Sequence, residues 1–178
     1  MLTLTVFWPS ETRAATTLEG FPARANGRAL AKGVTLADLD GDKKSEVIAA
    51  IGEGFTVVGA DGKMWSGYPK VLRETNDTST NHFDNAPTVC DVDGDGRLDI
   101  VLAGTNRRLY ALRPDGTYLS GFPVSLDGEP KGSVSCSIRG SGKANDLVLT
   151  TDNGSLLSVG SRGGKAKRLA RIGKGAES

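Results

Sequence analysis

The chain has 178 residues, of which 22 are basic and 21 are acidic, so its formal net charge is +1. This balance gives no support to binding of nucleic acid or of an acidic substrate, and no apolar run is long enough for a membrane-spanning helix. Abundant glycine (24 residues) and few aromatic side chains (6%) favour many short strands joined by turns, within one domain.

Residues 1–17 form an N-terminal segment for which two interpretations stay open. Its apolar stretch and the Ala14-Ala15 pair resemble the end of a secretory signal, but a positive amino-terminal region is missing and the apolar run is short. Leu2, Leu4 and Phe7 among Thr and Val residues are also compatible with a strand. We therefore expect either a truncated leader or an N-terminal strand or extension.

Three segments of the sequence align with one another: LADLDGDKKSEVIAAIG, VCDVDGDGRLDIVLAG and SCSIRGSGKANDLVLTT. They recur at intervals of about 50 residues, and a second marker, Gly-(Phe/Tyr)-Pro, recurs in phase at residues 20–22, 67–69 and 121–123. Asp-Gly pairs at 61–62 and 115–116 are flanked by apolar segments and predict hairpins. The pattern indicates a repeated β unit over residues 18–160.

Each unit predicts about four strands. An acidic loop leads into an apolar strand at 46–51 or 98–103, and a second strand follows a short turn at 55–58 or 108–112. A third, weaker strand is expected to end at Gly-(Phe/Tyr)-Pro, and a further strand or loop leads to the next unit. These runs are too short for helices and rich in β-branched residues. The expected fold is all-β, with about three four-stranded antiparallel repeats like the blades of a β-propeller; chance similarity within a β-sandwich is the alternative.

Two of the three units carry four acidic side chains at positions 1, 3, 5 and 9 of a loop. They are Asp38, Asp40, Asp42 and Glu46 in the first unit, and Asp91, Asp93, Asp95 and Asp99 in the second. Oxygen-only ligands, without His or Cys, favour calcium and less readily magnesium. Gly41 and Gly94 permit the tight turn that points these carboxylates inward. Position 7, Lys44 or Arg97, is expected to offer its backbone carbonyl while its side chain faces water.

Two other interpretations of these loops are weaker. An EF-hand loop begins similarly but needs a glutamate at position 12 and flanking helices, whereas position 12 is Ala49 or Leu102 inside an apolar run. An ion-free solvated turn would leave four carboxylates to repel one another. We therefore predict two calcium sites.

The third unit has lost the acidic residues. The four positions are occupied by Ser137, Arg139, Ser141 and Asn145. These side chains cannot neutralise a divalent cation, so we predict that this unit binds no metal. Hydrogen bonds from the Arg139 guanidinium to loop carbonyls are the expected substitute.

The D-x-D-G-D-x-x-x-[DE] loops before apolar strands resemble the FG-GAP/VCBS repeat family, the calcium-binding blades of integrin alpha-subunit-like propellers, and PDGTYLSGFPV is similar to bacterial members. The resemblance covers about residues 18–160, with two strong loops and one degenerate loop. It implies a β-propeller in which the eight loop acids bind calcium in a structural role.

Three units are too few to close a propeller, because known rings have at least four blades. Three ways of completing the arc stay open: two chains pair into a ring, the sequence is part of a larger propeller, or the chain packs on a partner.

Several other residues have weaker predictions. His82 is the only histidine, which is slight support for catalysis. Cys90 and Cys136 each precede position 1 of a loop; we expect equivalent sites of neighbouring units to be too far apart for a disulfide, leaving two small buried thiols. The aromatic residues of the Gly-(Phe/Tyr)-Pro markers are expected to wedge between units, with sugar stacking as the alternative; they are Phe21, Tyr68 and Phe122. Residues 161–178 are expected to form a basic, Gly-rich, frayed tail.

The leading functional hypothesis is a non-enzymatic, calcium-stabilised β-propeller module that binds protein or carbohydrate in adhesion. Moderate-affinity calcium sites suit an extracellular, cell-surface or periplasmic location. The alternative is a fragment of a secreted polysaccharide-degrading enzyme such as a lyase, although no convergent set of base and charge-stabilising residues is visible. A purely structural subunit is a third interpretation.

Overall fold

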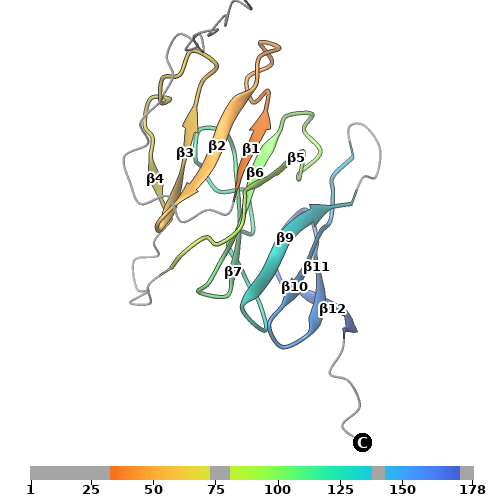
Figure 1. Cartoon of the computed structure of the whole chain (residues 1–178). Coiled ribbons are helices and arrows are strands. Elements are labelled where there is room, and N and C mark those ends of the chain that lie inside the picture. Colours follow the sequence, from red (N-terminus) through yellow and green to blue (C-terminus); the bar gives the residue numbers. More distant parts are fainter. Residues whose placement is uncertain (1–32, 73–80, 138–142, 173–178) are drawn as a thin grey trace, which may run out of the picture.

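The computed structural model describes residues 33–72, 81–137 and 143–172, and in this part of the chain every regular element is a β-strand (Figure 1). The first eight strands are β1 (Val34–Ala37), β2 (Glu46–Ile51), β3 (Gly54–Val58), β4 (Lys70–Val71), β5 (Thr88–Cys90), β6 (Asp99–Gly104), β7 (Arg108–Leu112) and β8 (Val124–Ser125). The last four are β9 (Pro130–Cys136), β10 (Leu147–Thr151), β11 (Ser155–Val159) and β12 (Lys167–Arg171).

The twelve strands form three antiparallel four-stranded sheets, each in chain order: sheet 1 (β1–β4), sheet 2 (β5–β8) and sheet 3 (β9–β12). This arrangement confirms the expected all-β fold of three four-stranded units. No helix in the described residues has the length and apolarity that crossing a membrane requires.

The central strands of the sheets match the sequence prediction, and the outer strands do not. Strands β2 and β7 have the predicted bounds, whereas the predicted strand before each Gly-(Phe/Tyr)-Pro marker is reduced to single bridges, Val58 to Met64 and Leu112 to Tyr118. The outer strands β4 and β8 begin directly after the marker, whose proline, Pro69 or Pro123, follows a cis peptide bond. Proline has no N–H to donate to a ladder, so it precedes the edge strand instead of lying inside a paired one.

Sheet 2 is buried on both faces because it lies between the other two sheets. Along β6, Ile100 and Leu102 belong to the core shared with sheet 1, while Val101 belongs to the core shared with sheet 3. Strand β7 alternates in the same way, with Tyr110 facing sheet 1 and Leu109 facing sheet 3. Successive side chains of a strand point to opposite faces, which explains why these strands are apolar at nearly every position.

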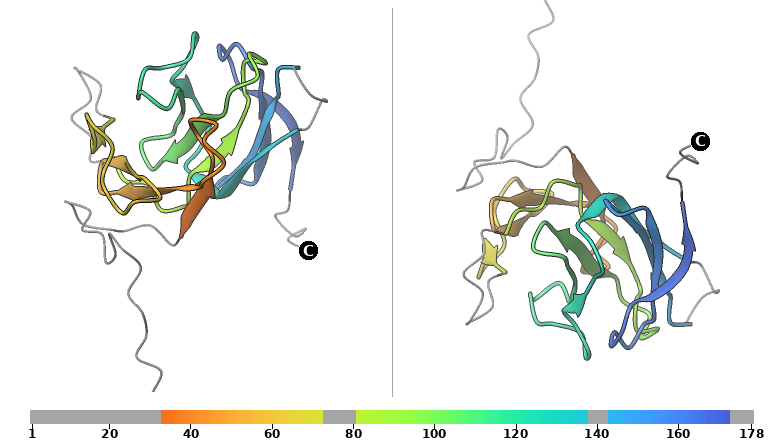
Figure 2. Two further views of the ribbon diagram at one scale, coloured as in Figure 1. Left: turned by 90° about the horizontal axis from the view of Figure 1, so that it is seen from above. Right: turned by 90° about the horizontal axis from the view of Figure 1, so that it is seen from below.

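The two inter-sheet cores differ in composition. The core between sheets 1 and 2 contains the buried rings of Phe55, Phe83 and Tyr110, and the last two meet edge to face with centroids 5.6 Å apart. The core between sheets 2 and 3 is largely aliphatic, with Phe122 as its buried ring. Figure 2 shows the three sheets side by side, with sheet 2 in the middle.

Equivalent polar contacts recur at the two junctions between sheets. The Thr35 hydroxyl donates to the Pro87 carbonyl at the first junction, and the Thr88 hydroxyl donates to the Val134 carbonyl at 2.7 Å at the second. The Tyr68 hydroxyl donates to the carbonyl of Pro114 in the neighbouring sheet. Tyr68 thus lies at a junction between units, as predicted, whereas Phe21 lies outside the described residues.

The expected tail is structured over part of its length. Residues 167–171 form β12, which pairs with β11 as the outer strand of sheet 3, so the third unit extends past residue 160. All five residues of β12 are exposed, as a basic edge strand permits. The segment 1–17 lies outside the described residues.

Candidate metal centre

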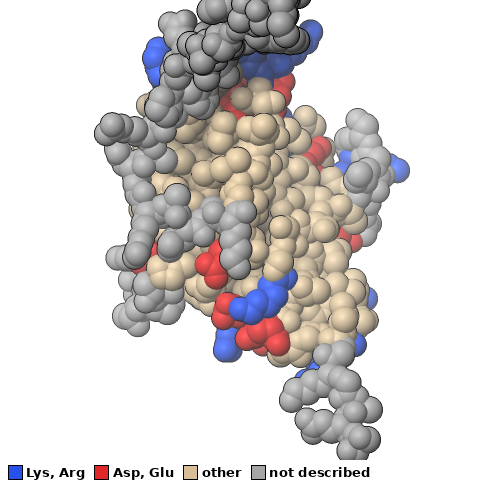
Figure 3. All heavy atoms as spheres, viewed as in Figure 1, with Lys and Arg blue, Asp and Glu red and all other residues tan. Residues whose placement is uncertain are grey.

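The two acidic loops lie at the same end of neighbouring sheets. Loop 1 (residues 38–46) leads from β1 into β2, and loop 2 (residues 91–99) leads from β5 into β6. Residues of both loops line one pocket of about 460 Å³, among them Asp38 and Asp40 from loop 1 and Asp99 from loop 2. Figure 3 shows charged side chains gathered at the ends of the molecule, including acidic ones over the connection between β1 and β2.

The acid at position 9 closes the base of each loop. Ala37 pairs with Glu46, and Cys90 pairs with Asp99, so each position 9 acid is the first residue of a central strand. Both acids are only 2% exposed. Each accepts the backbone N–H of position 2, at 2.8 Å for Glu46 and 2.9 Å for Asp99.

The remaining carboxylates hold the loop backbone through the same hydrogen bonds in both copies. The position 1 acid accepts the N–H of position 4 at 2.7 Å in both loops, and the N–H of position 6 at 2.9 Å in loop 1 and 3.0 Å in loop 2. Position 3 accepts the N–H of position 5 at 3.1 and 3.2 Å, and position 5 accepts that of position 7 at 2.7 and 2.8 Å. The two loops therefore share one conformation, although the residues at positions 2, 6, 7, 8 and 9 differ.

Two positions of each loop have left-handed backbone. At position 4, Gly41 has φ of 83° and Gly94 has φ of 84°. At position 6, Gly96 has φ of 87°, whereas loop 1 places Lys43 there with φ of 70°. A side chain in this region costs free energy, so loop 1 carries a strain that loop 2 avoids.

The structure brings three of the four predicted acids together in each loop. In loop 1 the ligand oxygens of Asp38, Asp40 and Asp42 lie within 4.8 Å of one another, and in loop 2 those of Asp91, Asp93 and Asp99 do. Glu46 and Asp95 are not part of these groups.

The predicted position 7 residues expose their side chains to solvent. Lys44 and Arg97 are both exposed, and the Lys44 ammonium lies 3.4 Å from the Asp42 carboxylate at the surface. Their backbone N–H groups take part in the loop; a carbonyl contribution to an ion stays a prediction.

Burial and charge crowding disfavour the ionised form of the position 9 acids. Burial raises the pKa of the Asp99 carboxyl to about 6, and the neighbouring charges of Asp93 and Asp95 act in the same direction. Burial and the other loop acids also raise the pKa of Glu46. In both cases the hydrogen bond from position 2 opposes the shift. Each loop thus has an electrostatic cost that a cation would remove.

The donor set fits a hard divalent cation. All grouped ligand atoms are carboxylate oxygens, which Ca²⁺ and Mg²⁺ prefer and softer metals do not. The structure adds one residue that the sequence analysis missed: the Arg113 guanidinium lies 3.2 Å from the Asp93 carboxylate. Arg113 belongs to the Asp-Gly hairpin of the same unit, two residues before Asp115. Its distance from Asp93 along the sequence does not show that the two side chains meet.

The third unit departs from the predicted correspondence. Counting from Ser137 places Asn145 at position 9, yet β10 begins at Leu147, which pairs with Cys136. Asn145 instead contacts sheet 2, where its side-chain amide donates to the Asp91 carbonyl at 2.6 Å. The longer connection turns this residue away from its own strand. Arg139 and Ser141 lie outside the described residues.

The expectation of two separate thiols is wrong. Cys90 and Cys136 form a disulfide, with their Cα atoms 6.6 Å apart. They lie on β5 and β9, the first strands of neighbouring sheets, and these strands contact each other. The sequence analysis assumed that equivalent positions are well separated, but the first strands of adjacent units contact each other. A disulfide is compatible with a secreted or periplasmic protein.

Two further features lie outside the acidic loops. A surface groove of about 440 Å³ is lined by Trp65, Tyr68 and Pro114 at the junction of sheets 1 and 2. The backbone of His82 exchanges two hydrogen bonds with Thr105, each 2.9 Å long, which explains its position by local packing.

Comparison of the chain with models of known protein families and with curated proteins produced no match.

A matched pair of glycine substitutions tests the loop geometry. Gly41→Ala adds a methyl group into open space, so left-handed strain alone should lower the free energy of unfolding by about 1 kcal/mol. At Gly94 the added carbon would lie 2.6 Å from the Ala144 nitrogen, so Gly94→Ala should cost about 2–4 kcal/mol. Urea denaturation of both variants measures the difference; equal losses would show that loop 2 is not packed against residue 144.

The buried Asp99 carboxyl predicts a pH dependence in the presence of chelator. Its pKa is higher in the folded chain than the ordinary value of 3.8, so the folded state binds the proton more tightly and stability falls as the pH rises through about 6. Between about pH 4 and about pH 7.5 this group should reduce the free energy of unfolding by on the order of 2 kcal/mol. Asp99→Asn should flatten this decline in urea titrations, and parallel curves for the two proteins would contradict the assignment.

Proposed function

We propose that the chain is a calcium-stabilised β-propeller module that binds a protein or glycan ligand outside the cell or in the periplasm and is not itself catalytic. The observation that carries the proposal is the duplicated loop: two connections with different intervening residues form the same five hydrogen bonds, each accepted by a carboxylate oxygen. Convergence on one conformation is best explained by one shared task, the binding of a cation.

Calcium suits these loops better than magnesium. Calcium accepts six to eight oxygen ligands in flexible geometry, whereas magnesium requires near-ideal octahedral geometry and retains water. Asp38, Asp40 and Asp42 would hold the ion in loop 1, and Asp91, Asp93 and Asp99 in loop 2. The bound ion would supply the positive charge that the buried position 9 acids lack, and it would thereby fix the entry into β2 and β6.

The propeller arrangement is supported by the repetition of the junctions. Three four-stranded sheets follow one another in chain order, and each junction repeats a hydroxyl-to-carbonyl hydrogen bond from Thr35 or Thr88. The disulfide between first strands is also compatible with units that converge on a common axis.

The groove beside Trp65 and Tyr68 is the surface that we assign to a ligand. Flat aromatic faces next to an acidic residue, here Asp115, suit the mixed apolar and polar surface of a sugar or of a protein side chain. The Lys70 ammonium lies 5.6 Å from the centre of the Tyr68 ring and adds a positive charge beside this aromatic face.

Calcium should raise stability through both loops. In thermal and urea unfolding, chelation is expected to lower the free energy of unfolding, and low millimolar calcium, but not magnesium, should restore about 1–3 kcal/mol per site. Asp93→Ala should remove the part that belongs to loop 2. Arg139→Ala, in the unit without acids, is the matched control and should leave the calcium-dependent gain unchanged. Identical unfolding curves with calcium and with chelator would refute the proposed function.

The outer sheets leave apolar side chains uncovered, which supports association. Val34 and Leu36 on β1 are 58% and 63% exposed, and Leu169 on β12 is 51% exposed. Such edges are templates for further β structure. If two copies complete a ring, light scattering should give twice the chain mass of 18.6 kDa. A monodisperse monomer at micromolar concentration would exclude closure by a second copy.

A further inference from the structure

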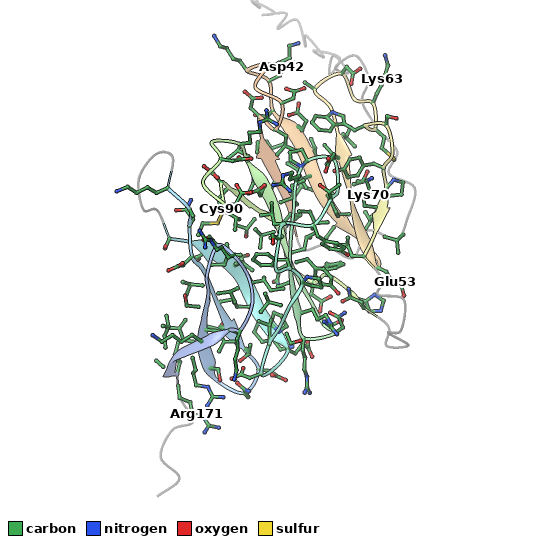
Figure 4. All side chains as sticks on the ribbon, turned by 180° about the vertical axis from the view of Figure 1, so that it is seen from behind. Asp42, Glu53, Lys63, Lys70, Cys90 and Arg171 are labelled. Carbon is green, nitrogen blue, oxygen red and sulfur yellow. A yellow bond between two sulfur atoms is a disulfide. The ribbon has the colours of Figure 1, made fainter. Side chains whose placement is uncertain are left out.

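The third sheet, which carries no acidic loop, is attached to loop 2 of the second sheet. The disulfide joins Cys136 to Cys90, the residue directly before position 1 of loop 2; Figure 4 shows it beside the Cys90 label. Asn145 forms hydrogen bonds with the next two residues of loop 2. Its side-chain amide donates to the Asp91 carbonyl at 2.6 Å, and its backbone N–H donates to the Val92 carbonyl at 3.0 Å. Positions 1 and 2 of loop 2 are thus held from outside their own sheet.

Packing extends this attachment to position 4. The Cα of Gly94 lies so close to the third sheet that an added carbon would stand 2.6 Å from the Ala144 nitrogen. Asp93 and Gly94 are half-buried, whereas Asp40 and Gly41, the same positions of loop 1, are exposed. The connection between β9 and β10 therefore packs against position 4 of the turn.

Loop 1 is an internal comparison without these contacts. The residue before its position 1 is Ala37, which cannot form a disulfide, and nothing lies within 4 Å of a carbon added at Gly41. Its own hydrogen bonds are nevertheless the same as those of loop 2. The two loops thus differ in their external support and at position 6, where loop 1 has the strained Lys43. They also differ at position 9, which is Glu46 or Asp99, and in the Arg113 contact with Asp93 of loop 2.

We propose that the degenerate third unit is a brace for loop 2, so that loop 2 binds a divalent cation more tightly than loop 1 and loses affinity when the disulfide or Asn145 is removed. The inference rests on the proposed calcium function. A loop that is held before the ion arrives loses less conformational entropy on binding, which raises affinity without any new ligand. Cys90, Cys136 and Asn145 are positioning residues, since none of them is a ligand in this proposal.

Single-site proteins test the brace. Asp38→Asn with Asp40→Asn leaves loop 2 as the binding loop, and Asp91→Asn with Asp93→Asn leaves loop 1. Calcium titration calorimetry compares each with the disulfide intact and with Cys90→Ser plus Cys136→Ser. The dissociation constant of loop 2 should rise roughly tenfold when the disulfide is lost, as it does for outer-shell supports of metal sites. That of loop 1 should change by less than about twofold.

Two single substitutions refine the comparison. Asn145→Ala should lower the calcium affinity of loop 2, as the loss of the disulfide should. It provides the same test if the double serine variant fails to fold. Thr88→Val is the matched control, because it removes the 2.7 Å hydrogen bond to the Val134 carbonyl between the same two sheets while leaving the contacts of loop 2 in place. This control should leave the affinity of loop 2 within about twofold of the parent.

Amide hydrogen exchange in chelator provides a readout that needs no ion. Loss of the disulfide, or Asn145→Ala, should speed exchange at the amides of Gly94 and Gly96, and should leave Gly41 and Lys43 unchanged. If neither single-site protein binds calcium, the proposed function fails. If both bind and the two loops respond equally to loss of the disulfide, or neither responds, the brace is refuted while the calcium function stands.

Discussion

The arrangement of the two acidic loops depends on the crowding of carboxylates in the turn between two paired strands. In each acidic loop, one acid is buried because it opens the central strand of a sheet, and others lie within 4.8 Å because the turn directs them to one point. Backbone N–H groups satisfy part of the acceptor capacity of these oxygens and hold the loop in shape. They do not remove the net negative charge, so the conformation that orders the chain is also the conformation that attracts a cation.

The packing of the sheets explains why the units depend on their neighbours. Sheet 2 has apolar side chains on both faces and is stable only when sheets 1 and 3 cover it. Because the first strands of adjacent sheets touch, the acidic loops that follow them are brought to one end of the molecule and close to each other. The position of each acidic loop therefore depends on how the neighbouring sheets pack.

The third unit lacks the acidic residues and contacts loop 2 of its neighbour. Without acids it has no set of ligands, but its connection is longer and turns Asn145 and Ala144 toward the preceding sheet. The disulfide joins the two sheets at the same place. The contacts of the third unit are thus directed at the neighbouring loop, which a comparison of the acidic positions alone would not suggest.

The repeat and the acidic loops were predictable from sequence because they are local. Alternating acids with a glycine at position 4 define a turn, and a following run of β-branched residues defines a strand, whatever surrounds them. These features correctly predicted the all-β fold and the bounds of β2 and β7. Three of the four acids of each loop lie together, and their role as calcium ligands stays a prediction.

Contacts between units had to be read from the tertiary structure. The approach of the first strands decided that Cys90 and Cys136 are bonded, and the extra length of the third connection decided that Asn145 serves its neighbour. Local sequence determines which turns and strands a segment favours; the distance between equivalent points of adjacent sheets depends on how whole sheets pack, and no single repeat encodes it.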